Sequence, residues 1–70
     1  MHYETIVSQV SYEDKTVQTY GIKATDTSGT VRTVEDISTN KSAVEALVTL
    51  CNREGLALCH LDDVIEDFLS

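Results

Sequence analysis

The sequence predicts an α+β fold, a three-stranded antiparallel β-meander followed by an αα-hairpin packed on one face of the sheet. Two observations favour this fold. Residues 3–34 contain runs rich in β-branched and aromatic residues separated by polar turns, which is typical of strands. Residues 40–69 repeat apolar residues every three or four positions, as amphipathic helices do. Because one apolar sheet face and two such helices bury each other in two layers, we expect residues 1–70 to form a single small domain.

Three strands are expected, at Tyr3–Val10, Thr16–Thr25 and Thr30–Val34, and short polar turns between them favour antiparallel pairing. Alternate residues of the second strand share a face. The more apolar face, which we expect to cover the core, consists of Gln18, Tyr20, Ile22 and Ala24. The opposite face consists of Val17, Thr19, Gly21 and Lys23. Gly21 inside a strand is typical of a bulge, or of a place where another group packs close to the backbone.

The first helix is predicted to begin after Asn40 and to end at Gly55. Asn40 is a good capping residue, and Gly55 favours the left-handed conformation that terminates helices. A capping box formed by Ser42 and Glu45 is an alternative start. The apolar side of this helix consists of Val44, Leu47, Val48 and Cys51. Since Cys51 lies at the centre of that side, we expect it to be buried as a small hydrophobic residue.

The second helix is predicted at residues 58–69, LCHLDDVIEDFL, after a connection short enough to form a helical hairpin. Its apolar arc consists of Leu58, Leu61, Val64, Ile65, Phe68 and Leu69. The other arc consists of Cys59, His60, Asp62, Asp63, Glu66 and Asp67. This separation predicts a helix that docks on the core with one face and presents an acidic face to solvent.

The chain is small and acidic. At this size, folding buries roughly 60% of the surface of the unfolded chain, so the core must be small. The net charge is −7, and the five basic residues are scattered singly. Such a charge opposes binding to nucleic acid or to an anionic membrane, and favours a basic protein or a cation. Because no long apolar run or signal-peptide pattern is present, we expect a cytoplasmic protein.

Cys59, His60 and Asp63 are the candidates for a metal or thiol site. Cys59 lies near a helix N-terminus, which favours a thiolate, but the carboxylates of Asp62 and Glu66 oppose it. Because adjacent helical residues point about 100° apart, His60 does not face Cys59. The sequence also lacks the paired spacing of zinc ligands and the glycine-rich loops that bind phosphate.

We therefore expect a non-enzymatic protein without a cofactor, because a domain this small leaves little room for a ligand pocket. The leading prediction is an interaction or regulatory module that binds an unknown protein partner, or itself as a homodimer, through a strand edge and uncovered apolar surface. The predicted interaction surface consists of Val17, Thr19, Asp62 and Glu66. One alternative is a metal- or thiol-dependent site at Cys59, His60 and Asp63. Another is an acidic helix that imitates a nucleic-acid backbone on a basic protein.

Three stretches together resemble a known family: Tyr20-Gly21-Ile22, Glu35-Asp36-Ile37-Ser38, and HLDDVIEDFL at residues 60–69. In this order, they resemble a family of short proteins of clostridia-like bacteria, recorded only as a domain of unknown function. The resemblance leaves the first strand outside. It implies a cytoplasmic bacterial protein with this fold and implies no activity. The family pattern places Ser-Pro before the last helix, where this chain has Ala57 and Leu58, so we expect a poorly capped helix start.

Overall fold

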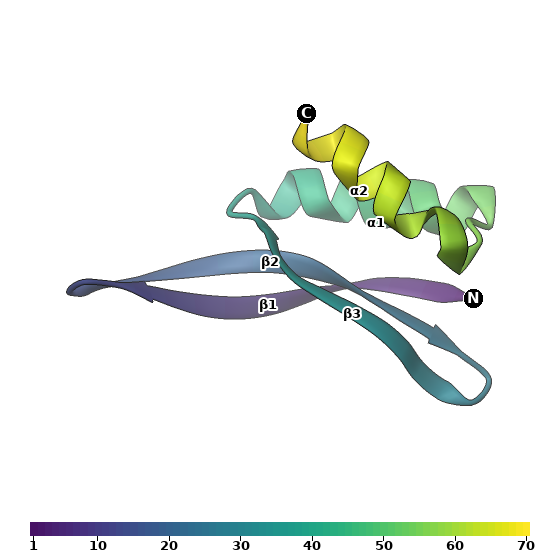
Figure 1. Cartoon of the computed structure of the whole chain (residues 1–70), viewed down its shortest axis with the longest axis horizontal. Helices are drawn as coiled ribbons and strands as arrows, with labels where there is room; N and C mark the ends of the chain where they lie inside the picture. Colours follow the sequence, from purple (N-terminus) through teal and green to yellow (C-terminus); the bar gives the residue numbers. More distant parts are fainter.

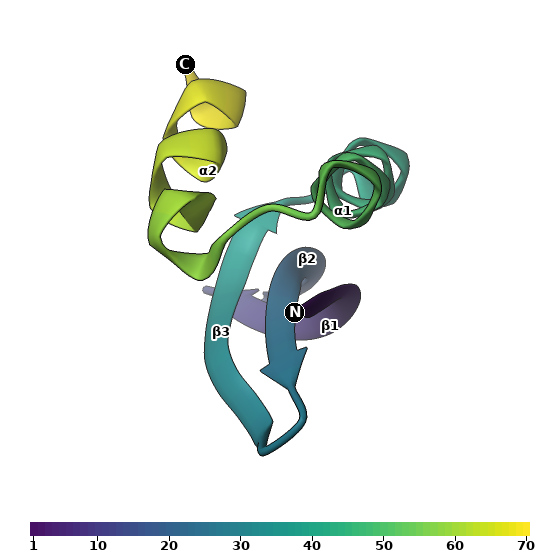
Figure 2. The same cartoon turned by 90° about the vertical axis from the view of Figure 1, so that its right-hand side faces the viewer.

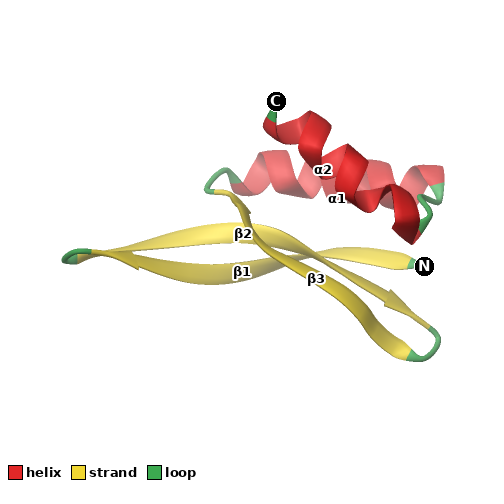
Figure 3. Cartoon of the chain, in the orientation of Figure 1, coloured by secondary structure: helices red, strands yellow, loops and turns green.

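The computed structural model describes residues 1–70 and has the predicted α+β fold, with both helices on one face of a three-stranded antiparallel sheet (Figures 1 and 3). The strands follow the order β1-β2-β3, as expected for a meander. A short 3-10 turn, η1, precedes the last helix. The elements are β1 His2–Tyr12, β2 Lys15–Asp26, β3 Gly29–Ser38, α1 Lys41–Glu54, η1 Leu58–His60 and α2 Leu61–Leu69.

The β1–β2 hairpin is longer than the layer of helices that covers it. Its register is continuous over the whole of β1. In contrast, β3 pairs with β2 only from Tyr20 to Asp26. Residues 8–19 therefore form a two-stranded ribbon that projects beyond the helices (Figure 1). For this reason Gln18 is exposed, and its predicted place in the core is wrong.

A β-bulge extends β3 to Ser38, beyond the predicted end of this strand. Residues 35–37 form the bulge, and Asp36 within it adopts a positive φ of 55°. The bulged strand passes so close to β2 that a Cβ atom on Gly21 would lie 2.1 Å from the carbonyl oxygen of Val34. No side chain fits there, which confirms the close approach predicted for Gly21.

The hydrophobic core lies between the sheet and the helices. The ten buried apolar residues of this core are Tyr3, Ile22, Ala24, Ile37, Val44, Leu47, Val48, Cys51, Leu61 and Ile65. The sequence signals at both ends of α1 are confirmed. The side chain of Asn40 accepts a hydrogen bond from the backbone N–H of Ala43 at 3.2 Å, and Gly55 ends the helix with a φ of 61°. Since α1 begins at Lys41, the alternative start at Ser42 is wrong.

The last helix is held less tightly than α1. Only Leu61 and Ile65 of α2 are fully buried, and Leu69 is exposed because the C-terminal end of α2 rises away from the sheet (Figure 1). Neither Ala57 before η1 nor His60 before α2 makes a capping hydrogen bond through its side chain, which confirms the predicted poor cap. None of the helices has the length and apolar content needed to cross a membrane.

Candidate functional site

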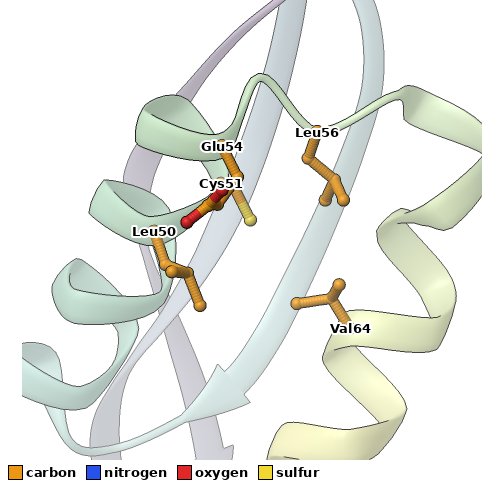
Figure 4. A pocket seen from close by; sticks show the side chains of 5 residues that line it. All are labelled: Leu50, Cys51, Glu54, Leu56 and Val64. Atoms are coloured by element: carbon orange, nitrogen blue, oxygen red, sulfur yellow. The ribbon is translucent and has the colours of Figure 1, made fainter.

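The candidate site is an apolar cleft of about 120 Å³ between α1 and α2. Its lining residues are Leu50, Cys51, Glu54, Leu56 and Val64. In Figure 4, Val64 projects from α2 toward α1, and Leu56 enters from the segment that joins the helices. Four of the five side chains are hydrophobic, and Glu54 is the one charged group.

The cleft exists because the two helices diverge. Gly55 ends α1, and the chain then passes through Leu56 and Ala57 before η1 begins. Figure 2 shows α1 above the β1 side of the sheet and α2 above the β3 side, with a gap between their axes. Leu50 lies on the flank of the buried side of α1, and 40% of its surface is exposed. Apolar side chains from both helices thus border a space that neither helix fills.

The groups in the cleft are poorly suited to chemistry. Burial raises the pKa of the Cys51 thiol, so the sulfur is protonated at neutral pH and is a weak nucleophile. Pockets for small-molecule ligands usually measure about 300–1,000 Å³, well above the size of this cleft. Apart from Glu54, the lining offers no side chain that could orient a polar substrate. The arrangement suits one apolar side chain of another molecule.

A hydrogen-bonded clamp fastens the end of α1 to the outer edge of β1. The Tyr3 backbone N–H donates to Asn52 Oδ1 at 2.8 Å, and Asn52 Nδ2 donates to the Tyr3 carbonyl oxygen at 2.8 Å. The Tyr3 hydroxyl donates to the Leu56 carbonyl oxygen at 2.7 Å, and burial raises the pKa of this phenol. The sequence predictions missed this clamp, because Asn52 reads as an ordinary polar residue beside the apolar side of a helix.

The residues of the predicted metal or thiol site do not form a cluster. Cys59 and His60 are exposed in the η1 turn, and Asp63 is exposed in the first turn of α2. Cys59 is a free thiol, as is Cys51, which is buried as predicted. No group of three or more His, Cys, Asp or Glu side chains is placed to hold a metal ion.

The predicted interaction surface is wrong at Thr19, which is only 2% exposed. Thr19 pairs with Ser8, and the larger side chains of Ile6, Val10 and Val17 on the same face of the hairpin are themselves half-buried. These neighbours lie close enough on one face of a paired hairpin to cover a small side chain. The Thr19 hydroxyl has no hydrogen-bond partner.

The two predicted surface acids of α2 have different surroundings. Glu66 is exposed on α2 and forms no ion pair. Asp62 is exposed as well, but its carboxylate forms an ion pair of 2.5 Å with Arg32 of β3. The hydrogen bond from Arg32 holds the pKa of Asp62 below its ordinary value and raises the pKa of the guanidinium. This ion pair connects α2 to the sheet.

Comparison with known proteins gives a family and no activity. Neither a search of curated proteins nor a search of solved structures found a match. A family described as "Family of unknown function (DUF6514)" matches residues 1–70, so the match includes β1, which the resemblance of the three sequence stretches had left outside. The chain belongs to this family of unknown function, DUF6514.

Proposed function

We propose that this protein is a non-enzymatic interaction module that binds an apolar side chain of a partner protein in the cleft between α1 and α2. The open cleft carries the proposal. Its lining is apolar, and Leu50 is 40% exposed although it borders the buried side of α1. Anchoring one apolar side chain in a small desolvated pocket is a common way for protein interfaces to gain affinity.

The charge of the chain indicates which partners would fit. Glu54 lies in the cleft, and Asp63 and Glu66 are exposed on the adjacent helix. With a net charge of −7, the chain attracts basic segments and repels acidic ones. The partner segment would therefore carry an apolar anchor flanked by lysine or arginine. Two free cysteines fit a reducing compartment such as the cytoplasm.

The test compares two exposed apolar residues with the same exposure. Leu50 in the cleft and Val31 on β3 are each 40% exposed, and only Leu50 lines the cleft. We expect Leu50→Glu to abolish capture of the partner from a lysate of the source organism, because the partner's apolar side chain would desolvate the new carboxylate on entering the cleft. Val31→Glu should capture the same partner as the unmodified chain. Quantitative mass spectrometry of the captured proteins provides the measurement.

Two results would contradict the proposal. The first is a partner that remains bound to Leu50→Glu as well as to Val31→Glu, since the cleft would then play no part. The second is that no captured protein binds the unmodified chain more strongly than it binds Leu50→Glu. The circular dichroism spectra of both variants should match that of the unmodified chain, which would show that each substitution leaves the fold in place.

A further inference from the structure

We propose that two copies of this chain pair through the outer edges of their β1 strands, antiparallel to each other, and form one continuous sheet. This inference rests on the hairpin and is independent of the cleft between the helices. It concerns residues 5–11, the part of β1 between the clamp at Tyr3 and the turn at Glu13.

The clamp shows which backbone groups point outward. Both backbone polar groups of Tyr3 bond to Asn52 on the side of β1 away from β2. In an antiparallel ladder the direction of these groups alternates with each residue, and the β1–β2 register has no break. The backbone N–H and C=O groups of Thr5, Val7, Gln9 and Ser11 therefore also point to the open edge. Among these outward-pointing residues, only Tyr3 has its backbone groups hydrogen-bonded to α1.

The hairpin needs support that this chain does not supply. From residue 8 to residue 19 the ribbon has no third strand, and the helices do not reach it (Figure 1). Val7, beside this ribbon, is 55% exposed although it lies on the same face as the core residue Tyr3. Two-stranded ribbons are marginally stable in water unless further strands or helices pack on them. A strand added at the β1 edge would give the ribbon its missing neighbour.

The two edges of the sheet differ in their protection. Proteins prevent unwanted pairing at sheet edges with charged side chains and bulges. The β3 edge has both, because Glu35 and Asp36 lie in its bulge and Arg32 precedes it. Residues 5–11, TIVSQVS, carry no charge and no bulge. The β1 edge is thus the edge that remains open to another strand.

The occupant that fits best is the same segment of a second copy. Ser8 is the centre of residues 5–11, so a twofold axis through Ser8 pairs the whole segment with itself. Thr5 then lies opposite Ser11, and Val7 opposite Gln9, which allows about eight backbone hydrogen bonds between outward-pointing groups. A chain with a net charge of −7 would meet its copy over a segment without charge, so like charges do not oppose each other there.

The same arrangement also matches side chains on the face away from the helices. Ile6 lies opposite Val10 of the second copy, in the type of pair where side chains approach most closely. Ile6 and Val10 are half-buried in one chain and would be covered further by their counterparts. Apolar pairs of this kind stabilise a sheet relative to pairs of alanine.

The test uses the twofold axis at Ser8. Sedimentation equilibrium of the unmodified chain should give a dimer. Ser8→Lys and Ser8→Glu each place like charges opposite each other, so each variant alone should dimerise up to about fivefold more weakly. An equimolar mixture of the two should recover dimerisation and form the mixed dimer in excess of its statistical share. A defect in folding alone could not produce this recovery.

Three results would overturn the proposal. They are a monomeric unmodified chain at millimolar concentration, a dimer that neither substitution weakens, and two weakened variants whose mixture shows no recovery. If neither variant folds, amide hydrogen exchange of the unmodified chain decides. Exchange at Thr5, Val7, Gln9 and Ser11 should slow as concentration rises, while exchange at Val31 in β3 should not change. If exchange at the β1 edge does not depend on concentration, the dimer is rejected. If a different protein binds at this edge, the edge serves that partner and not a second copy of the chain.

Discussion

At the scale of single residues, Thr19 is a buried polar group without a partner. Its hydroxyl has no hydrogen bond, and only 2% of the residue is exposed. We expect Thr19→Val to raise the free energy of unfolding by about 1 kcal/mol, because it removes an unsatisfied hydroxyl and preserves the branched shape. Urea denaturation measures this change, with the exposed Thr33→Val as the matched control. A loss of stability in Thr19→Val larger than in the control would show that the hydroxyl has a partner.

The ion pair between Arg32 and Asp62 predicts a pH dependence. Because Arg32 hydrogen-bonds the ionised carboxylate, the pKa of Asp62 in the folded chain lies below its ordinary value of 3.8. The contribution of this pair to stability is present above pH 3.8 and is lost as the pH falls through the lower pKa of the folded chain. Titration of the Asp62 carboxyl by carbon NMR should show the lowered pKa. In Arg32→Gln, the pKa should return toward 3.8, whereas Lys23→Gln should leave it unchanged.

At the scale of elements, the start of the last helix is the point where one substitution should add most stability, because this helix start lacks a side-chain cap. Ala57 already has the extended conformation of a capping residue, with φ −74° and ψ 144°, but its side chain cannot accept a hydrogen bond. We expect Ala57→Ser to stabilise the chain by about 1 kcal/mol through a new bond to a free N–H of the turn. Ala46→Ser, at an exposed position inside α1, should be neutral or slightly destabilising. Thermal unfolding of both variants provides the measurement, and equal effects would reject the capping argument.

The elements that could be predicted from the sequence are those specified by local signals. The bounds of α1 follow from Asn40 and Gly55, because capping depends on residues next to the helix end. The extension of β3 to Ser38 could not be predicted, since the bulge at residues 35–37 interrupts the alternation of side chains. The exposure of Gln18 depends on how far the helices reach over the hairpin. That distance is set by packing between distant segments.

The candidate site was only partly accessible from sequence for the same reason. The apolar character of Leu50 is evident from the sequence. The place of Leu50 in a cleft depends on the angle at which α2 diverges from α1 (Figure 2). No local sequence pattern indicates that angle. Asn52 and Tyr3 are far apart in the chain and meet only in the folded structure. The chemically suggestive residues Cys59 and His60 were conspicuous in the sequence, yet they lie on an exposed turn.

At the scale of the whole molecule, the fold is elongated, with principal extents of 40 × 27 × 18 Å. The cleft lies between the helices, whereas the open edge of β1 belongs to the hairpin that projects beyond them (Figures 1 and 2). Pairing through β1 would therefore leave both clefts accessible. A dimer of this kind presents two copies of the cleft on one rigid sheet, so a partner with two apolar anchors would bind it more tightly than it binds one copy.

The contact between Gly21 and the bulge of β3 has a consequence for how sequences with this fold can change. Two of the three stretches that carried the family resemblance, Tyr20-Gly21-Ile22 and Glu35-Asp36-Ile37-Ser38, are the two sides of this one contact. A residue with a side chain at position 21 would require a bulge of another shape, and a regular β3 would remove the need for glycine. We therefore expect substitutions in these two stretches to be correlated: a change at position 21 should occur only together with a change in residues 35–38.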